Sequence, residues 1–174
     1  MTEELTDARS SLPAALGDSV PEDATIRDVL SFTLADEIYA LPLGSIHEIL
    51  KTPPITHVPR APEDVLGIIS VRGRITTVLD LRRRLHLEHE PSSARARILL
   101  VDSGVELLGL LVDEVHQVHR LTPAEVELSS MVSGELADYV LGIGRPGVGR
   151  AAETGASAEL LILLDPESLL KRMS

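Results

Sequence analysis

The 174-residue chain lacks cysteine and tryptophan and contains only three aromatic side chains, Phe32, Tyr39 and Tyr139. The absence of cysteine excludes disulfides, thiolate catalysis and cysteine-ligated zinc, and it is compatible with a reducing compartment. The shortage of aromatics requires an aliphatic core and leaves few platforms on which bases or sugars could stack. No apolar run is long enough to cross a bilayer, and the N-terminus lacks the features of a signal peptide. We therefore expect a soluble cytoplasmic protein without direct membrane insertion.

Positive charge is also scarce. The chain has 16 Lys and Arg against 27 Asp and Glu, a formal net charge of −11. Such a field repels phosphate backbones, so nucleic-acid binding would need a strong local basic patch. The one candidate is Arg82-Arg83-Arg84, which follows Asp80 and is typical of the solvated start of a helix. The sequence therefore predicts no nucleic-acid partner.

The acidic charge is concentrated at the N-terminus. Residues 1–28 carry seven acids and two arginines, with two prolines and several serines, which predicts a disordered or transiently helical leader outside the fold. Short β-type runs begin at Val29, and turn signals stand at Asp36-Glu37, Arg72-Gly73 and Ser103-Gly104. The expected strands span residues 29–35, 38–43, 65–71, 74–79, 97–102, 105–112, 115–120 and 159–164, with a weaker one at 139–143.

Repeated short strands with tight turns predict an all-β fold with few short helices, because a parallel sheet would need a helix between each pair of strands. We expect helices at 44–50, at 80–86 and at 166–172, the last capped by Asp165. A break near 87–94 is expected to separate two halves of the domain.

Catalytic and metal motifs are weak throughout. His86 and His89 lie in the expected linker, whereas His116 and His119 lie in a β-type run, where side chains three apart point to opposite faces. The glycines of Gly142-x-Gly144-x-x-Gly147 lack the strand and helix that would let them cradle a pyrophosphate. We predict no catalytic residue, no cofactor and no metal site, and hence a protein that is not an enzyme.

The most informative stretch is the run from Leu66 to Arg82, in which two apolar strands flank Arg72-Gly73. Glycine at 73 accepts the positive φ of a tight hairpin, so Arg72 must either face solvent or find a carboxylate. A protein-binding surface is the remaining functional hypothesis, because sheet edges and grooves bind strands or amphipathic helices. The candidate lining residues, which also suit a core, are Val65, Gly67, Ile68, Val112 and Val115.

This stretch and its surroundings resemble the chemotaxis coupling protein CheW family. The similarity extends over roughly residues 29–172 and rests on several segments in the family's order, rather than on one motif. The matching segments are Ile38-Tyr39-Ala40-Leu41-Pro42-Leu43, His47-Glu48-Ile49-Leu50, Ile55-Thr56-His57-Val58-Pro59-Arg60-Ala61-Pro62, Gly109-Leu110-Leu111-Val112-Asp113-Glu114-Val115 and Leu161-Ile162-Leu163-Leu164-Asp165. One departure is Ser70, which stands where the family usually has Asn before the Arg-Gly turn.

The resemblance implies two intertwined five-stranded barrels of SH3-like form around a shared core. It also implies an ion pair between Arg72, beside Gly73, and Glu48. The implied partners are the regulatory domain of a CheA-type histidine kinase and the cytoplasmic tip of a methyl-accepting chemoreceptor, so the chain would be recruited to membrane receptor arrays. The alternatives are a detached regulatory domain of a CheA-type kinase and a small β-barrel protein that binds a ligand or a metal.

Overall fold

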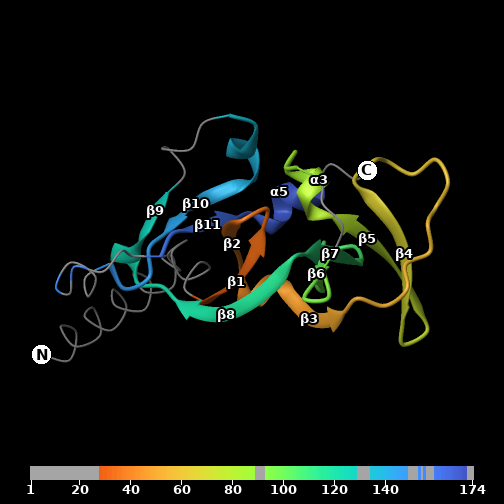
Figure 1. Ribbon diagram of the computed structural model, residues 1–174, viewed down its shortest axis with the longest axis horizontal. Helices are drawn as coiled ribbons and strands as arrows, with labels where there is room; N and C mark the ends of the chain where they lie inside the picture. The colour runs from red at the N-terminus through yellow and green to blue at the C-terminus, as the bar shows by residue number, and fades with distance from the viewer. Residues whose placement is uncertain are drawn as a thin grey trace, which may run out of the picture.

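The computed structural model describes residues 28–88, 93–128, 134–148, 153, 155 and 159–171, and they form two β-sheets with short helices (Figure 1). Residues 1–27 of the predicted leader lie outside the described residues, and Asp28, its expected last residue, is the first residue of β1. The strands are β1 (Asp28–Leu34), β2 (Glu37–Pro42), β3 (Ile46–Lys51), β4 (Val65–Val71), β5 (Arg74–Asp80), β6 (Arg97–Asp102), β7 (Leu107–Val112), β8 (Glu114–Arg120), β9 (Val126–Leu128), β10 (Val140–Gly144) and β11 (Leu161–Leu164).

The helices that can be bounded within the described residues are α3 (Leu81–Arg84), α5 (Pro166–Leu170) and the 3₁₀ turns η1 (Leu43–Ser45), η2 (Pro123–Glu125) and η4 (Glu135–Tyr139). Asp80 and Asp165 cap α3 and α5, each accepting a backbone N–H bond, so the predicted helices at these two places are confirmed. In the described part of the chain, no helix is long and apolar enough to cross a membrane.

The all-β fold class is confirmed. One sheet has six strands in the order β8-β1-β2-β11-β10-β9, and the other has five in the order β3-β6-β7-β5-β4. Within the described residues these orders are open, so each half is a curled sheet and not a fully hydrogen-bonded barrel. The six-stranded sheet also exceeds the five strands expected for each half.

The two sheets exchange chain segments, so the predicted break near 87–94 is wrong as a boundary. Strands β5 and β6, on either side of that segment, belong to the same five-stranded sheet. The chain instead leaves the six-stranded sheet after Pro42 and returns to it at Glu114. Two parallel pairings cause this exchange, β2 with β11 and β5 with β7, and local sequence patterns do not encode such distant partners.

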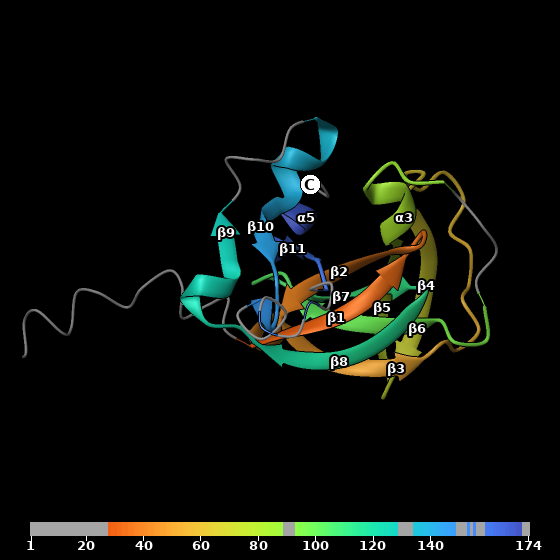
Figure 2. The same ribbon diagram turned by 60° about the vertical axis from the view of Figure 1, so that its left-hand side comes forward.

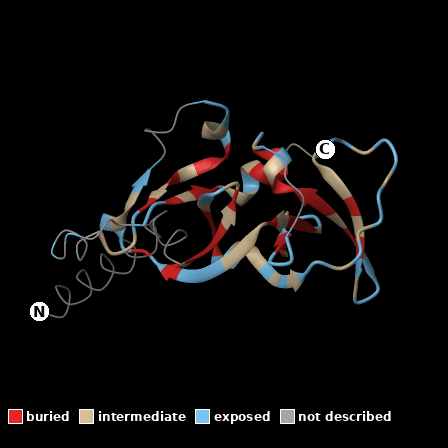
Figure 3. Cartoon of the chain, viewed as in Figure 1, coloured by how far each residue is buried: buried red, intermediate tan, exposed pale blue. Residues whose placement is uncertain are grey.

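Three apolar clusters fill the molecule, and strand alternation assigns residues to them. On β6, Leu99 and Val101 face the large core between the sheets, whereas Ile98 and Leu100 face the interior of the curled five-stranded sheet. A third cluster, which includes Val29, fills the curl of the six-stranded sheet. Both faces of these strands are therefore buried, which explains their nearly continuous apolar sequences (Figure 3).

The shared core holds the few aromatic residues available. Phe32 and Tyr39 stack with ring centroids 6.5 Å apart, and both are fully buried. Burial, followed by the charge of Glu37 and a hydrogen bond to its carboxylate, raises the pKa of the Tyr39 phenol above its ordinary value. The phenol is therefore neutral at physiological pH.

The predicted helix at 44–50 is wrong, because most of that segment is strand β3. Its burial alternates, with Glu48 and Leu50 half-buried and His47 and Ile49 exposed, and the strand pairs with β6. Long-range pairing has overridden the local preference. The first hairpin turn lies at Ala35-Asp36, one residue before the predicted position, with φ of 48° and 70°.

Arg82 and Arg84 are largely buried in helix α3, which corrects the expectation of a solvated helix start for these two, whereas Arg83 is exposed. Arg84 is 8% exposed and donates to Leu169 O at 3.0 and 2.8 Å and to Asp64 Oδ2 at 2.6 Å. Arg83 donates to Glu63 O at 3.0 Å. These side chains fasten α3 to α5 and to the connector before β4.

A Cβ atom at Gly67 would lie 2.1 Å from the carbonyl oxygen of Thr56. Thr56 lies this close because it forms an antiparallel β-bridge with Ile68, the next residue of β4. Gly44 has no neighbour within 4 Å of the same position. We expect Gly67→Ala to lower the free energy of unfolding by about 2 kcal/mol or more, and Gly44→Ala by about 0.5 kcal/mol or less. Urea unfolding followed by circular dichroism measures both, and equal effects would contradict the close approach.

Candidate protein-binding site

The tip of the β4–β5 hairpin is tied to strand β3 by an ion pair. Arg72 and Gly73 form the two-residue turn, with φ of 48° and 79°, and Arg72 Nη2 lies 2.7 Å from Glu48 Oε1. The predicted hairpin turn and ion pair are therefore confirmed. Strands β3 and β4 are the two edge strands of the five-stranded sheet, so the ion pair connects one edge of the curled sheet to the hairpin at the other edge. With Arg72 74% exposed, the pair contributes only about 0–1 kcal/mol to stability.

A second feature lies where the two sheets end. Strand β3 is an edge of the five-stranded sheet and β8 an edge of the six-stranded sheet, and they run side by side in opposite directions (Figures 1 and 2). Ile49 pairs with Leu99, and Val118 pairs with Leu30. Since paired residues share a face and both partners are buried in the shared core, Ile49 and Val118 also point to the core side.

Ile49 and Val118 are nevertheless 43% and 50% exposed. Ile46 and Val115 are partly buried and pack against the same core. We call these four residues, Ile46, Ile49, Val115 and Val118, the apolar seam. The shared core thus reaches the surface between the two edge strands, beside the Glu48–Arg72 pair.

The structure separates the predicted lining residues into different roles. Val115 lies in the seam, whereas Val112 is fully buried in the shared core and cannot line an accessible surface. Gly67 is buried against Thr56 and serves close packing. Val65 and Ile68 are half-buried on β4, the opposite edge of the five-stranded sheet from the seam. Among the described residues, the predicted candidates therefore do not form one continuous lining.

Sequence reasoning missed three residues of the seam, Ile46, Ile49 and Val118. The first two were assigned to a helix, although the alternation of His47, Ile49 and Lys51 with half-buried neighbours has the period of a strand. Val118 stands among polar residues of β8, so only its pairing with Leu30 shows that it faces the core side.

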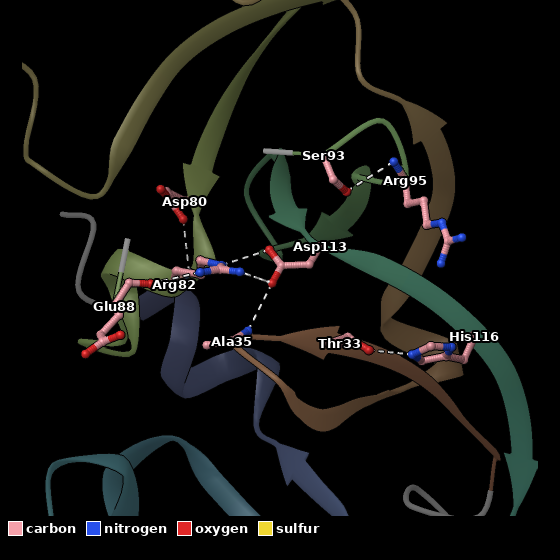
Figure 4. A network of polar contacts seen from close by, with 9 residues as sticks. All are labelled: Thr33, Ala35, Asp80, Arg82, Glu88, Ser93, Arg95, Asp113 and His116. Atoms are coloured by element: carbon pink, nitrogen blue, oxygen red, sulfur yellow. Dashed lines mark hydrogen bonds and ion pairs between the residues drawn. The ribbon is translucent and has the colours of Figure 1, made fainter. Parts of the chain in front are cut away.

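A polar network at the start of β8 joins helix α3, which follows β5 of the five-stranded sheet, to strands of the six-stranded sheet (Figure 4). Arg82 Nε donates to Asp113 Oδ1 at 2.8 Å, and Arg82 Nη2 forms a further short contact with Asp113 Oδ2. The same carboxylate accepts the Ala35 N–H at 3.0 Å, and the Asp113 N–H donates to Thr33 O at 3.1 Å. Helix α3, strand β1 and the β7–β8 junction are thereby joined.

The two histidines of β8 do not converge. His116 is exposed, with its Nε2 beside Thr33 Oγ1, whereas His119 is 9% exposed, with its Nε2 3.1 Å from Ser31 Oγ. His86 is exposed, and His89 lies outside the described residues. Across the described ranges, no group of three or more His, Asp or Glu side chains is arranged to hold a metal ion.

The glycine-rich loop after β10 is occupied by a carboxylate of the chain itself. Gly147 N–H donates to Glu125 Oε1 at 2.9 Å, and Thr122 N–H donates to Glu125 Oε2 at 2.8 Å. The backbone donor at Gly147 is therefore already satisfied, and the loop does not offer the arrangement of a phosphate cradle.

Comparison with known proteins supports the same fold. The family model for the CheW-like domain matches residues 28–174. The chemotaxis protein CheW of Helicobacter pylori is 24% identical over 159 residues, covering 91% of this chain and 90% of that protein. The CheW of Thermotoga maritima is 31% identical over 104 residues, covering 60% and 68%.

A solved structure is similar along most of its length. The crystal structure of the scaffolding protein TtCheW from Thermoanaerobacter tengcongensis matches with a TM-score of 0.72 and 29% identity, covering 83% of this chain and 92% of that one. The chain belongs to the family of CheW-like domains.

The Arg82–Asp113 contact is more enclosed than Glu48–Arg72, with side chains 11% and 25% exposed. We expect Asp113→Asn to lower the free energy of unfolding by about 2–4 kcal/mol, because Arg82 would lose the charge of the Asp113 carboxylate, to which it forms two close contacts. Glu48→Gln, at the exposed pair, is expected to cost about 1 kcal/mol or less. Urea unfolding of both variants checks the difference, and an equal loss would contradict a structural role for Asp113.

Proposed function

We propose that this chain is a non-enzymatic adaptor that couples chemoreceptors to a CheA-type histidine kinase. The observation that carries the proposal is the apolar seam, where the shared core of a CheW-like domain reaches solvent beside the Glu48–Arg72 pair. An exposed apolar strip next to fixed polar groups is typical of a protein-binding site. The location in this proposal is the cytoplasm, at receptor arrays.

The seam suits the receptor helix. An amphipathic helix presents apolar side chains at i, i+3, i+4 and i+7 along one stripe, and the two antiparallel edge strands offer a matching row of aliphatic side chains. The resemblance to the CheW family implies that the part of the chemoreceptor tip that binds is a helix. Arg72, 74% exposed at the neighbouring hairpin, would lie beside the bound helix and contact polar groups on it.

The kinase would bind a different surface. On the outer face of the β4–β5 hairpin, Ile75 is 69% exposed and pairs with Ser70, while half-buried Ile68 lies two residues along the same face. Ser70 replaces the Asn usual in the family, and its hydroxyl is shorter and provides one donor, so this position would tune the choice of kinase. Val65 and Ile68 retain their proposed binding role here.

Two surfaces on one packed body explain how coupling would occur without chemistry. A receptor bound at the seam and a kinase bound at the hairpin would be held at a fixed mutual geometry, and a change in one would bias the other. Each contact alone would be modest, and assembly into arrays would strengthen the whole. No cofactor or metal takes part in this proposal.

The seam gives a sharp test with a matched control. We expect Val118→Glu to weaken binding of a receptor-tip fragment at least about tenfold, because a charge would be buried under the helix. Val105→Glu, at a 95% exposed residue of the β6–β7 turn, is expected to leave binding unchanged. Calorimetry of each variant with the receptor fragment and with the kinase regulatory domain provides the measurement.

Ile75→Glu is the reciprocal variant. We expect it to weaken binding of the kinase regulatory domain and to leave binding of the receptor fragment unchanged. Circular dichroism must show that all three variants are folded. If the wild-type chain binds neither fragment, or if Val118→Glu and Val105→Glu bind the receptor equally, the seam is not the receptor site.

A further inference from the structure

The seam is bordered by unpaired positive charge at one end. Lys51 and Arg97 lie directly opposite each other on β3 and β6, on the same face as Ile49. Arg97 donates to the carbonyls of Ala94 and Ala96, and within the described ranges neither cation has an acidic partner. Two neighbouring cations without a counter-charge beside an apolar strip favour an acidic, partly apolar occupant.

Charge is divided unevenly over the molecule. Residues 43–112, which contain the strands of the five-stranded sheet, carry nine Lys and Arg against eight Asp and Glu. Residues 28–42 and 113–174, which contain the strands of the six-stranded sheet, carry five against thirteen, and residues 1–27 carry two against six. An acidic segment is therefore repelled by the six-stranded half and attracted toward Lys51 on β3 and Arg97 on β6.

The leader enters the fold at one end of the seam. Asp28, the first residue of β1, pairs with Arg120, two residues beyond Val118 on β8. Their side chains also form an ion pair at 3.6 Å. The opposite end of the seam lies near Lys51, because Arg95, just before β6, contacts Glu114 at the start of β8 at 3.5 Å.

The sequence of the leader matches this surface. Leu12, Ala15 and Leu16 are spaced i, i+3, i+4, which would align them on one side of a helical turn. The acids Glu3, Glu4 and Asp7 precede this group. The 11 residues from Gly17 to Arg27 can extend about 36 Å, whereas β8 is about 23 Å long, so the apolar group can reach any part of the seam.

We propose that the leader of the same chain occupies the apolar seam, with Leu12, Ala15 and Leu16 against Ile49, Val115 and Val118 and the first acids against Lys51 and Arg97. The leader is then an internal competitor for the partner helix. This regulatory meaning rests on the function proposed above, whereas the contact itself does not. Tethering favours such a contact, because it gives the leader a high effective concentration at the seam.

The absence of cysteine allows a clean test on the full chain. A nitroxide attached to Ser10→Cys is expected to broaden the NMR methyl signals of Ile49, Val115 and Val118 far more than those of Ile75 and Val105, which are exposed elsewhere. Lys51→Glu is expected to abolish the difference, and Arg74→Glu, at an exposed residue of the hairpin, to leave it intact. Equal broadening at all five methyl sites, or at none, overturns the proposal.

The source of the occupant is distinguished by mixing chains. Spin-labelled chains without isotope are added to isotope-labelled chains without spin label. The comparison sample is the chain that carries both the spin label and the isotope label. If the methyl signals of the seam broaden equally in the mixture and in that sample, the occupant is a second copy, and the internal contact is overturned. Loss of the broadening on mixing supports it.

Partner affinity tests the regulatory part separately. If the leader covers the seam in about nine molecules of ten, its release strengthens binding of a receptor-tip fragment about tenfold. The variant Glu3→Gln, Glu4→Gln, Asp7→Asn is expected to show this gain while remaining folded. Unchanged affinity overturns the competition, whereas failure of both proteins to bind the fragment contradicts the proposed function and leaves the broadening result standing.

Discussion

The shared core between the two sheets is the constraint on which the rest of this structure depends. Both sheets place aliphatic side chains into it, and strand exchange means that neither half is built from one continuous segment. The hairpin β1–β2 lies between β8 and β11, so the N-terminal strands complete a sheet formed otherwise by the C-terminal part of the chain. Burial of apolar area, worth roughly 25 cal/mol per Å², therefore couples the two halves into one packed body.

The candidate binding site is a consequence of this packing. Sheets that end beside each other cannot fully enclose the core between them, and the apolar seam lies where β3 and β8 end their sheets. The Arg82–Asp113 network holds α3, β1 and the start of β8 together, so the two sheets are linked by contacts that do not involve the seam residues themselves. An adaptor that works by geometry requires such a fixed relation between its surfaces.

Charge is distributed unevenly between the two halves of the molecule. The five-stranded half is nearly neutral and contains the unpaired cations beside the seam, while the acids are concentrated in the six-stranded half and the leader. In a chain with a net charge of −11, local positive charge next to an exposed apolar strip is a selective feature. It favours occupants that combine acids with aliphatic side chains, whether they belong to the chain itself or to a partner.

The sequence by itself determined the elements whose physics is local: the all-β class, most strands, the Arg72-Gly73 turn and the capped helices at Asp80 and Asp165. Similarity to a family added the Glu48–Arg72 pair. Only the tertiary structure decided that 46–51 is a strand, that Val112 and Gly67 are packed inside, and that the consecutive arginines fasten distant segments. Periodicity shows which side chains share a face, but parallel pairing between distant strands decides which face is buried and where the core remains open.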